Sequence, residues 1–126
     1  MNPREARVGD LLPSSVVDRR RPRRIDATAL LIPGTQQTDV YVAATAARGD
    51  DFRAWDGGVV VAEPDGGADH RLLIVDRYRQ VYAVHEAAET VDLPDADALE
   101  EWFRFLATAC PECGVIDDPS RDGPTP

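Results

Sequence analysis

The chain contains no lysine, and none of its apolar runs approaches the ~20 residues that cross a bilayer. Its N-terminus, Met1–Glu5, lacks the apolar stretch of a secretory signal peptide. The sequence also lacks a Ser/His/Asp set, paired carboxylates, a Gly-rich phosphate loop and an EF-hand loop. These absences argue against a membrane-spanning or exported protein and against the common hydrolase, nucleotide-binding and calcium-binding classes. They predict a cytoplasmic location.

The 126 residues suffice for one domain with a substantial core, since 43% of them are hydrophobic. Acidic residues outnumber arginines by 23 to 14, which gives a formal net charge of −9. Such a negative field repels phosphate backbones and anionic lipid surfaces. We therefore expect neither nucleic acid nor a membrane as a partner. A protein partner or a second copy in a homodimer is compatible with this charge.

One basic stretch departs from this balance, because Arg19–Arg24 contains five arginines in six residues. It is either a patch for phosphate or an acidic partner, or a solvated linker before the first core strand. Asp10, Asp18 and Asp26 lie close enough in the sequence to offset much of its charge. This proximity favours the linker.

Composition divides the chain into three parts. Residues 1–24 are a polar, Arg-rich segment with at most a short edge strand around Ser15–Asp18. Residues 25–116 form the folded domain. Residues 117–126 are rich in Pro, Gly and Asp and lack an apolar anchor, which predicts a disordered tail.

The first half of the domain is predicted to contain two buried strands around a helix. Ala27–Ile32, closed by Pro33-Gly34, and Val59–Ala62 are short apolar runs bounded by turn residues. Between them, apolar residues in Gln36–Trp55 recur near a 3.6-residue period, which predicts a helix. Gly49-Asp50 should end or kink this helix, and Thr35 or Thr38 could cap its start. The β-branched residues Val40 and Val42 leave a strand as the alternative.

The second half is predicted to contain a hairpin and a helix. Leu72–Val75 and Val81–Val84 flank a short polar link, which indicates an antiparallel hairpin whose turn Asp76 fixes. The first of these strands is apolar on both faces and should lie inside the sheet. A final helix should begin at the N-cap Asp95 and end at Pro111. Its apolar face comprises Leu99, Trp102, Phe103, Leu106 and Cys110.

This order of elements predicts an α/β fold with a mixed sheet of about four strands covered by helices. It resembles the thioredoxin fold, and several motifs resemble more narrowly the redoxin family of alkyl hydroperoxide reductases and thiol-specific antioxidants. The matching stretches are Val8–Pro13, which is similar to the family's V-G-D-x-x-P opening, Phe52–Ala62, Leu72–Val84 and Leu93–Leu106. The resemblance implies a thioredoxin-like domain and an antioxidant or oxidoreductase ancestry.

The chain departs from the family where the chemistry should be. The family's reactive cysteine begins the helix after the first strand, but Pro33–Asp39 contains no cysteine here. Asp69-His70-Arg71 replaces the proline that usually precedes the hairpin, and the link from Glu63 to Arg71 is too short for the family's connecting helix. We therefore expect a shortened redoxin relative without peroxidase activity.

The only two cysteines, Cys110 and Cys113, form a C-P-E-C-G motif after the last helix. In a reducing compartment such a pair is more often redox-active or metal-binding than a structural disulfide. A redox dithiol would lack help from the helix dipole, because the C-terminal end of a helix disfavours a thiolate. The motif also resembles the turn of zinc ribbons, in which case His70, His85 or a second subunit must complete the four zinc ligands. The third possibility is an inert pair that fills space.

Three functional hypotheses follow. The protein retains a thiol–disulfide role through Cys110 and Cys113, or it is a non-catalytic thioredoxin-like module that binds a protein, or it is a dimer held by zinc. The other conspicuous residues have structural explanations. We expect His70 in a loop, His85 as a packed or surface residue, and Trp55 and Trp102 in the core.

Overall fold

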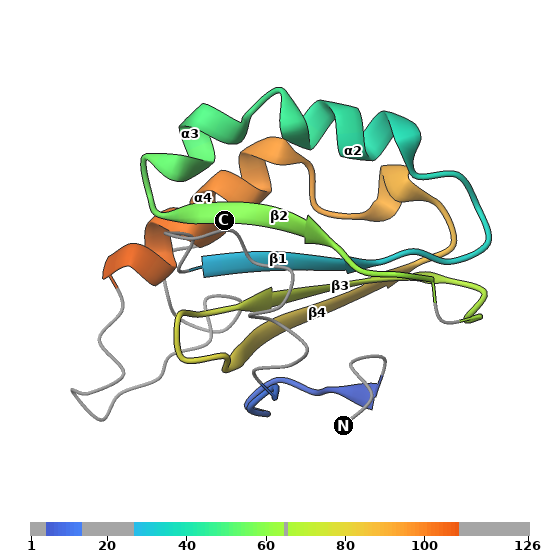
Figure 1. Ribbon diagram of the computed structural model, residues 1–126, viewed down its shortest axis with the longest axis horizontal. Coiled ribbons are helices and arrows are strands. Elements are labelled where there is room, and N and C mark those ends of the chain that lie inside the picture. The colour runs from blue at the N-terminus through green and yellow to red at the C-terminus, as the bar shows by residue number, and fades with distance from the viewer. Residues whose placement is uncertain (1–4, 14–26, 65, 109–126) are drawn as a thin grey trace.

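The computed structural model describes residues 5–13, 27–64 and 66–108. Figure 1 shows the elements in their order along the chain. They are β1 (Ala27–Ile32), α2 (Asp39–Ala46), α3 (Gly49–Arg53), β2 (Gly57–Val61), β3 (His70–Val75), β4 (Val81–Ala87), the 3-10 helix η2 (Thr90–Asp92) and α4 (Ala96–Thr108).

The strands form one mixed sheet in the order β2-β1-β3-β4. β1 and β2 run parallel, with Ala27 opposite Gly57, whereas β1–β3 and β3–β4 are antiparallel. This confirms the predicted α/β fold with a mixed four-stranded sheet, an arrangement compatible with a thioredoxin-like fold. The central strands β1 and β3 are buried along their whole length, as their apolar sequences require.

The hairpin between β3 and β4 has the predicted turn. Asp76 Oδ1 accepts the backbone N–H of Tyr78 at 2.8 Å and that of Gln80 at 2.9 Å. Arg79 has a positive φ of 69°, the left-handed conformation that closes such a turn. The prediction that Asp76 fixes the hairpin is confirmed.

The segment 36–55 is helical, so the alternative of a strand was wrong. Its helix is interrupted just before Gly49, and α2 and α3 are separate helices. The predicted threonine cap was also wrong. Thr38 occupies the N-cap position without a side-chain hydrogen bond, and Thr35 Oγ1 donates to the carbonyl of Ala68 instead.

The last helix begins as predicted, because Asp95 Oδ1 accepts the N–H of Ala98 at 2.9 Å. The predicted apolar face is buried from Leu99 to Leu106. Cys110 and Pro111 lie outside the described residues. So do the possible edge strand at Ser15–Asp18, the arginines 19–24 and the predicted tail.

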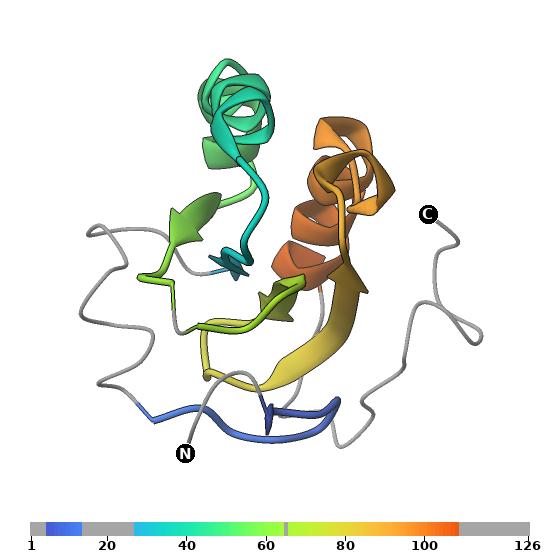
Figure 2. The same cartoon turned by 90° about the vertical axis from the view of Figure 1, so that its right-hand side faces the viewer.

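The helices α2, α3 and α4 of the described residues lie on one face of the sheet, as Figure 2 shows. Their apolar side chains and those of the covered sheet face form the larger core. At Gly57 the packing excludes a side chain, since a Cβ would lie 2.7 Å from Cδ1 of Phe103. No helix is present in the described residues of the link between β2 and β3, which agrees with the prediction that this link is too short.

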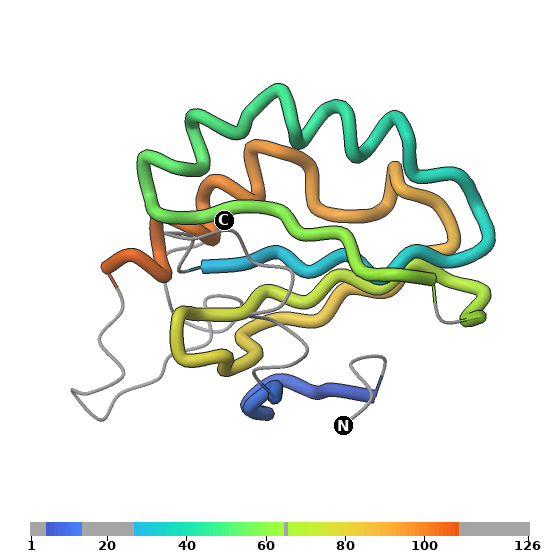
Figure 3. The backbone as a smooth tube through the Cα atoms, viewed as in Figure 1, coloured from blue at the N-terminus to red at the C-terminus, as the bar shows by residue number. Residues whose placement is uncertain are grey.

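Residues 5–13, which we call the N-terminal segment, run along the other side of the sheet beside the hairpin (Figure 3). Gly9 N–H donates to the Val81 carbonyl at 2.8 Å, and Leu12 N–H donates to the Arg79 carbonyl at 2.8 Å. The buried side chains of Ala6 and Leu12 belong to the second apolar core, together with side chains of the sheet face that the helices leave open.

Candidate functional site

The sheet end at which β1 and β2 finish is where the family resemblance places the reactive cysteine. We call it the loop end, and it comprises three segments. Residues 33–40 lead from β1 into the first turn of α2, residues 62–69 join β2 to β3, and residues 88–95 join β4 to α4. Figure 2 views the molecule from this end.

The first two of these segments are bonded to each other. Thr35 N–H donates to the Ala68 carbonyl at 3.0 Å, and Thr35 Oγ1 donates to the same oxygen at 3.2 Å. Gly34 N–H donates to Nδ1 of His70 at 2.8 Å. Three hydrogen bonds therefore fasten the loop before α2 to the link before β3.

Gly34 allows this close approach because it has no side chain. A Cβ at this position would lie 2.5 Å from the carbonyl carbon of Asp69 and closer still to the Ala68 oxygen. Both obstacles are backbone atoms, which cannot move away as a flexible side chain can. The loop end in its observed form therefore requires glycine at position 34.

His70 lies inside the fold, so its predicted place in a loop was wrong. It is the first residue of β3, it pairs with Ala87, and its side chain is fully buried. Pairing with β4 extends β3 two residues before the apolar run that marks it in the sequence. The lone pair of Nδ1 receives the Gly34 N–H, so in the neutral imidazole the proton lies on Nε2. Neither ring nitrogen then has a free lone pair for a metal ion, and His70 acts as a fastener of the loop.

His85 lies on β4 opposite Leu72, on the same sheet face as His70. It is half-buried, as expected of a packed histidine, and burial lowers the pKa of its imidazole. Its Nε2 has no hydrogen-bond partner in the part of the chain that the structure describes. Within that part, no three histidine, cysteine or acidic side chains are grouped as metal ligands. Cys110 and Cys113, the other predicted ligands, lie outside it, so zinc binding and dithiol chemistry stay predictions.

The loop before α2 offers hydroxyl and amide side chains only. Thr35, Gln36 and Gln37 are exposed, and Thr38 is half-buried at the first turn of the helix. A peroxidatic site needs a thiolate at this point, where the helix N-terminus would stabilise it. Threonine and glutamine supply no such nucleophile, so this loop can bind through hydrogen bonds but cannot reduce a peroxide.

Two valines protrude at the loop end. Val40 in the first turn of α2 is 82% exposed, and Val91 in η2 is 80% exposed, the largest values among the exposed large hydrophobic residues that the structure describes. Tyr41 Oη donates to the Pro94 carbonyl at 2.7 Å and so ties the start of α2 to the segment that carries Val91. Figure 1 shows the start of α2 and the segment between β4 and α4 at the same end of the helical layer.

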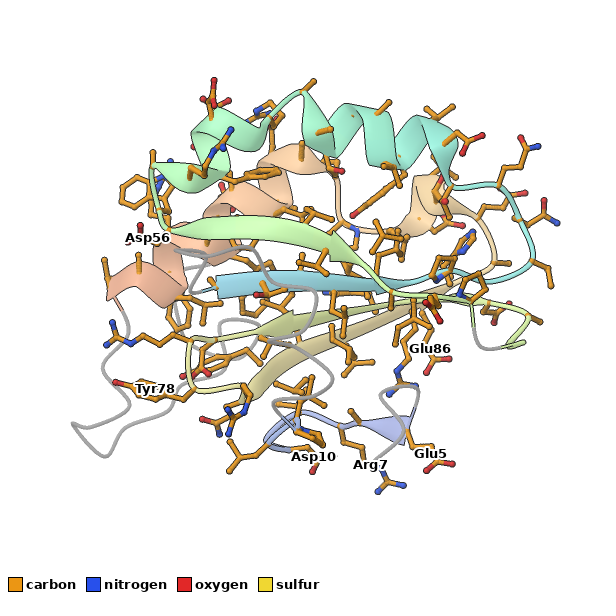
Figure 4. All side chains as sticks on the ribbon, viewed as in Figure 1. Glu5, Arg7, Asp10, Asp56, Tyr78 and Glu86 are labelled. Atoms are coloured by element: carbon orange, nitrogen blue, oxygen red, sulfur yellow. The ribbon has the colours of Figure 1, made fainter. Side chains whose placement is uncertain are left out.

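Acidic residues are frequent in the segments of the loop end, and Asp39 and Asp92 directly adjoin the two valines in the sequence. Among the described residues, the segments 33–40, 62–69 and 88–95 contain no arginine. Their acidic residues are Asp39, Glu63, Asp69, Glu89, Asp92 and Asp95. Glu86 is directed elsewhere, because it pairs with Arg71 at 2.6 Å beside the N-terminal segment (Figure 4). The loop end is therefore an acidic surface with two apolar projections.

The opposite end of the sheet has a shallow hollow beside Asp56, which is labelled in Figure 4. Trp55 lines it and packs against the larger core from the edge, where it is half-buried, whereas Trp102 is buried as predicted. The guanidinium of Arg104 lies 5.1 Å from the Trp55 ring centroid, a cation–π contact. Among the described residues that line this hollow, there is no cysteine, serine, threonine or histidine.

Comparison with known proteins does not assign the chain to a family. No protein-family model, curated protein or solved structure gives a significant match to the chain. Within the described residues, every helix is too short or too polar to span a bilayer. The redoxin resemblance thus remains a prediction from the sequence motifs, and the function has to be argued from the residues.

Proposed function

We propose that this protein is a non-catalytic module of thioredoxin-like architecture that binds a protein partner through its loop end. The observation that carries the proposal is the exposure of Val40 and Val91 beside a loop that holds no reactive side chain.

The contacts within the loop support a binding role rather than a chemical one. The bonds of Gly34 to His70 and of Thr35 to Ala68 hold the loop in one conformation before any partner arrives. A surface that is already ordered loses less conformational entropy on binding. Rigidity here therefore favours recognition.

The two valines supply the apolar contact area that a docking site needs. Complete burial of one valine side chain stabilises a complex by about 1.5 kcal/mol. Both together would contribute about 3 kcal/mol, a factor on the order of 100 in affinity. Within the part of the chain that the structure describes, no contact buries these valines, which are at least 80% exposed in α2 and η2.

The proposal is tested by capturing binding proteins from the native host with the full chain and with a Val40→Ser/Val91→Ser variant. Val8→Ser is the matched control, because Val8 is also exposed but lies on the N-terminal segment. We expect one or more host proteins to bind both the full chain and the Val8→Ser control. The same proteins should not bind the Val40→Ser/Val91→Ser variant. Equal retention by all three chains would contradict binding at the loop end.

A second measurement tests the absence of catalysis. In the presence of a dithiol reductant, the purified protein should not increase the rate of hydrogen peroxide consumption above that of the reductant alone. Disulfide exchange by the full chain should equal that of a Cys110→Ser/Cys113→Ser variant. A lower rate in the variant would instead establish the predicted thiol–disulfide role of the two cysteines and would refute the non-catalytic assignment.

A further inference from the structure

We infer that the loop end recognises a basic segment of another protein, in which aliphatic side chains are flanked by arginine or lysine. This inference rests on the proposed function and names the chemistry of its partner. It commits to a protein segment, since the net charge of −9 opposes binding of nucleic acid.

The first argument is charge complementarity. Apart from Asp69, five acidic residues lie in the loop-end segments, and the described residues of these segments contain no arginine. Most of the described arginines lie elsewhere, in the helical layer, at the hairpin turn of the far end and in the N-terminal segment: Arg48, Arg53, Arg104, Arg77, Arg79 and Arg7. Arg71 is the second residue of β3, beside the loop end, but its guanidinium pairs with Glu86 and donates to the Ala6 carbonyl. A basic segment would be attracted to the loop end, and an acidic one would be repelled.

Part of this negative charge is committed inside the fold. Asp95 caps α4 through the Ala98 N–H, and Asp39 lies in the first turn of α2, where the helix dipole favours it. Neither role neutralises the carboxylate as a cation would. The surface around Val40 and Val91 therefore keeps its negative field toward an approaching partner.

The second argument is the pairing of this field with apolar projections. Lysine and arginine carry long aliphatic stems, which pack on apolar surface while their charged groups remain in water. Val40 and Val91 present such apolar surface next to Asp39 and Asp92, their immediate neighbours in the chain. Aliphatic side chains between the basic residues would cover the valines, and the basic groups would face the neighbouring carboxylates.

A second copy of the chain is a poor occupant of this surface. Docking two loop ends would bring the six acidic residues of each copy together, and like charges in contact oppose association. Self-association through the loop end is therefore not expected, and the partner must carry the opposite charge.

The inference is tested by fluorescence anisotropy with labelled peptides and the full chain. The probe is Arg-Arg-Val-Ser-Val-Arg-Arg. Its controls replace every arginine with glutamate, or both valines with serine. We expect saturable binding of the probe only, weakened roughly tenfold between 50 and 300 mM salt, because ions screen exposed charges.

Two variants locate the binding. Val40→Ser/Val91→Ser should abolish saturation by the probe, and Asp39→Asn/Asp92→Asn should weaken binding roughly fivefold, as expected for two exposed charge pairs. Val8→Ser/Glu101→Gln, which makes the same types of change away from the loop end, should bind as the parent does. Circular dichroism of each variant establishes that it is folded.

The outcomes separate the inference from the function on which it rests. Equal binding of the arginine and glutamate peptides, or no binding of the probe at millimolar concentration, would overturn the basic partner. The binding role would then still be judged by the capture experiment with Val40 and Val91. Probe binding that the loop-end variants leave unchanged would also overturn the inference, because it would place the basic site elsewhere.

Discussion

Replacing Gly34 with alanine is the sharpest test of how the loop end is built. The new Cβ would lie 2.5 Å from the carbonyl carbon of Asp69, and real Cβ atoms do not approach backbone this closely. The loop must move away, and it then loses the Gly34 bond to His70 and both Thr35 bonds to Ala68. At about 1 kcal/mol for each hydrogen bond, the free energy of unfolding should fall by about 3 kcal/mol.

Urea denaturation followed by tryptophan fluorescence measures this loss. For a domain of this size the melting temperature should fall by roughly 12 °C or more. Gly49→Ala is the matched control, because its Cβ would meet only Nη2 of Arg53, at 3.7 Å. Gly49 is the first residue of α3, so alanine there should be neutral or stabilise by about 0.5 kcal/mol. A Gly34→Ala protein as stable as the Gly49→Ala protein would refute the account of the loop end.

Three further predictions concern single side chains. Asp76→Ala should lower the free energy of unfolding by about 2 kcal/mol, because two backbone N–H groups of the hairpin lose their acceptor. Asp76→Asn should lower it by less, and chemical denaturation of the parent and both variants measures the difference. Asp95→Ala should cost about 1 kcal/mol by removing the cap of α4, and Glu101→Ala, at an exposed site on the same helix, should change stability by under about 0.5 kcal/mol. Burial, and secondarily the charge of Asp95, raises the pKa of Tyr41 to about 12. The folded state then holds this proton more tightly than the unfolded state, so the free energy of unfolding should decline as pH rises from 10 to 12. Denaturation midpoints of Tyr41→Phe should decline less over this range. An equal decline in both proteins would contradict the assignment.

Local sequence patterns predicted the helix α4 and the buried strands β1 and β3. The apolar face of α4 and its aspartate cap follow from residue spacing within one helix. The buried strands β1 and β3 follow from apolar runs closed by turn residues.

Contacts between distant residues could not be predicted in this way. The hydrogen bond from Gly34 to His70 joins positions 36 residues apart, and it depends on the register of β1 against β3. The length of β3 depends on its pairing with β4, so His70 lies in a strand although no apolar run includes it. Thr35 bonds to Ala68 for the same reason, since a nearby carbonyl from another segment competes with the helix cap. In each case tertiary contacts override a local preference.

The N-terminal segment has a consequence for the solubility of the protein. It bonds to residues at the hairpin turn, and its Ala6 and Leu12 belong to the apolar core on the sheet face opposite the helices. Strand backbone left without a partner next to uncovered aliphatic side chains is a template for intermolecular β-pairing. Proteolytic removal of the first thirteen residues should therefore convert a dispersed protein into one that aggregates, although every helix and strand named here would remain in the chain.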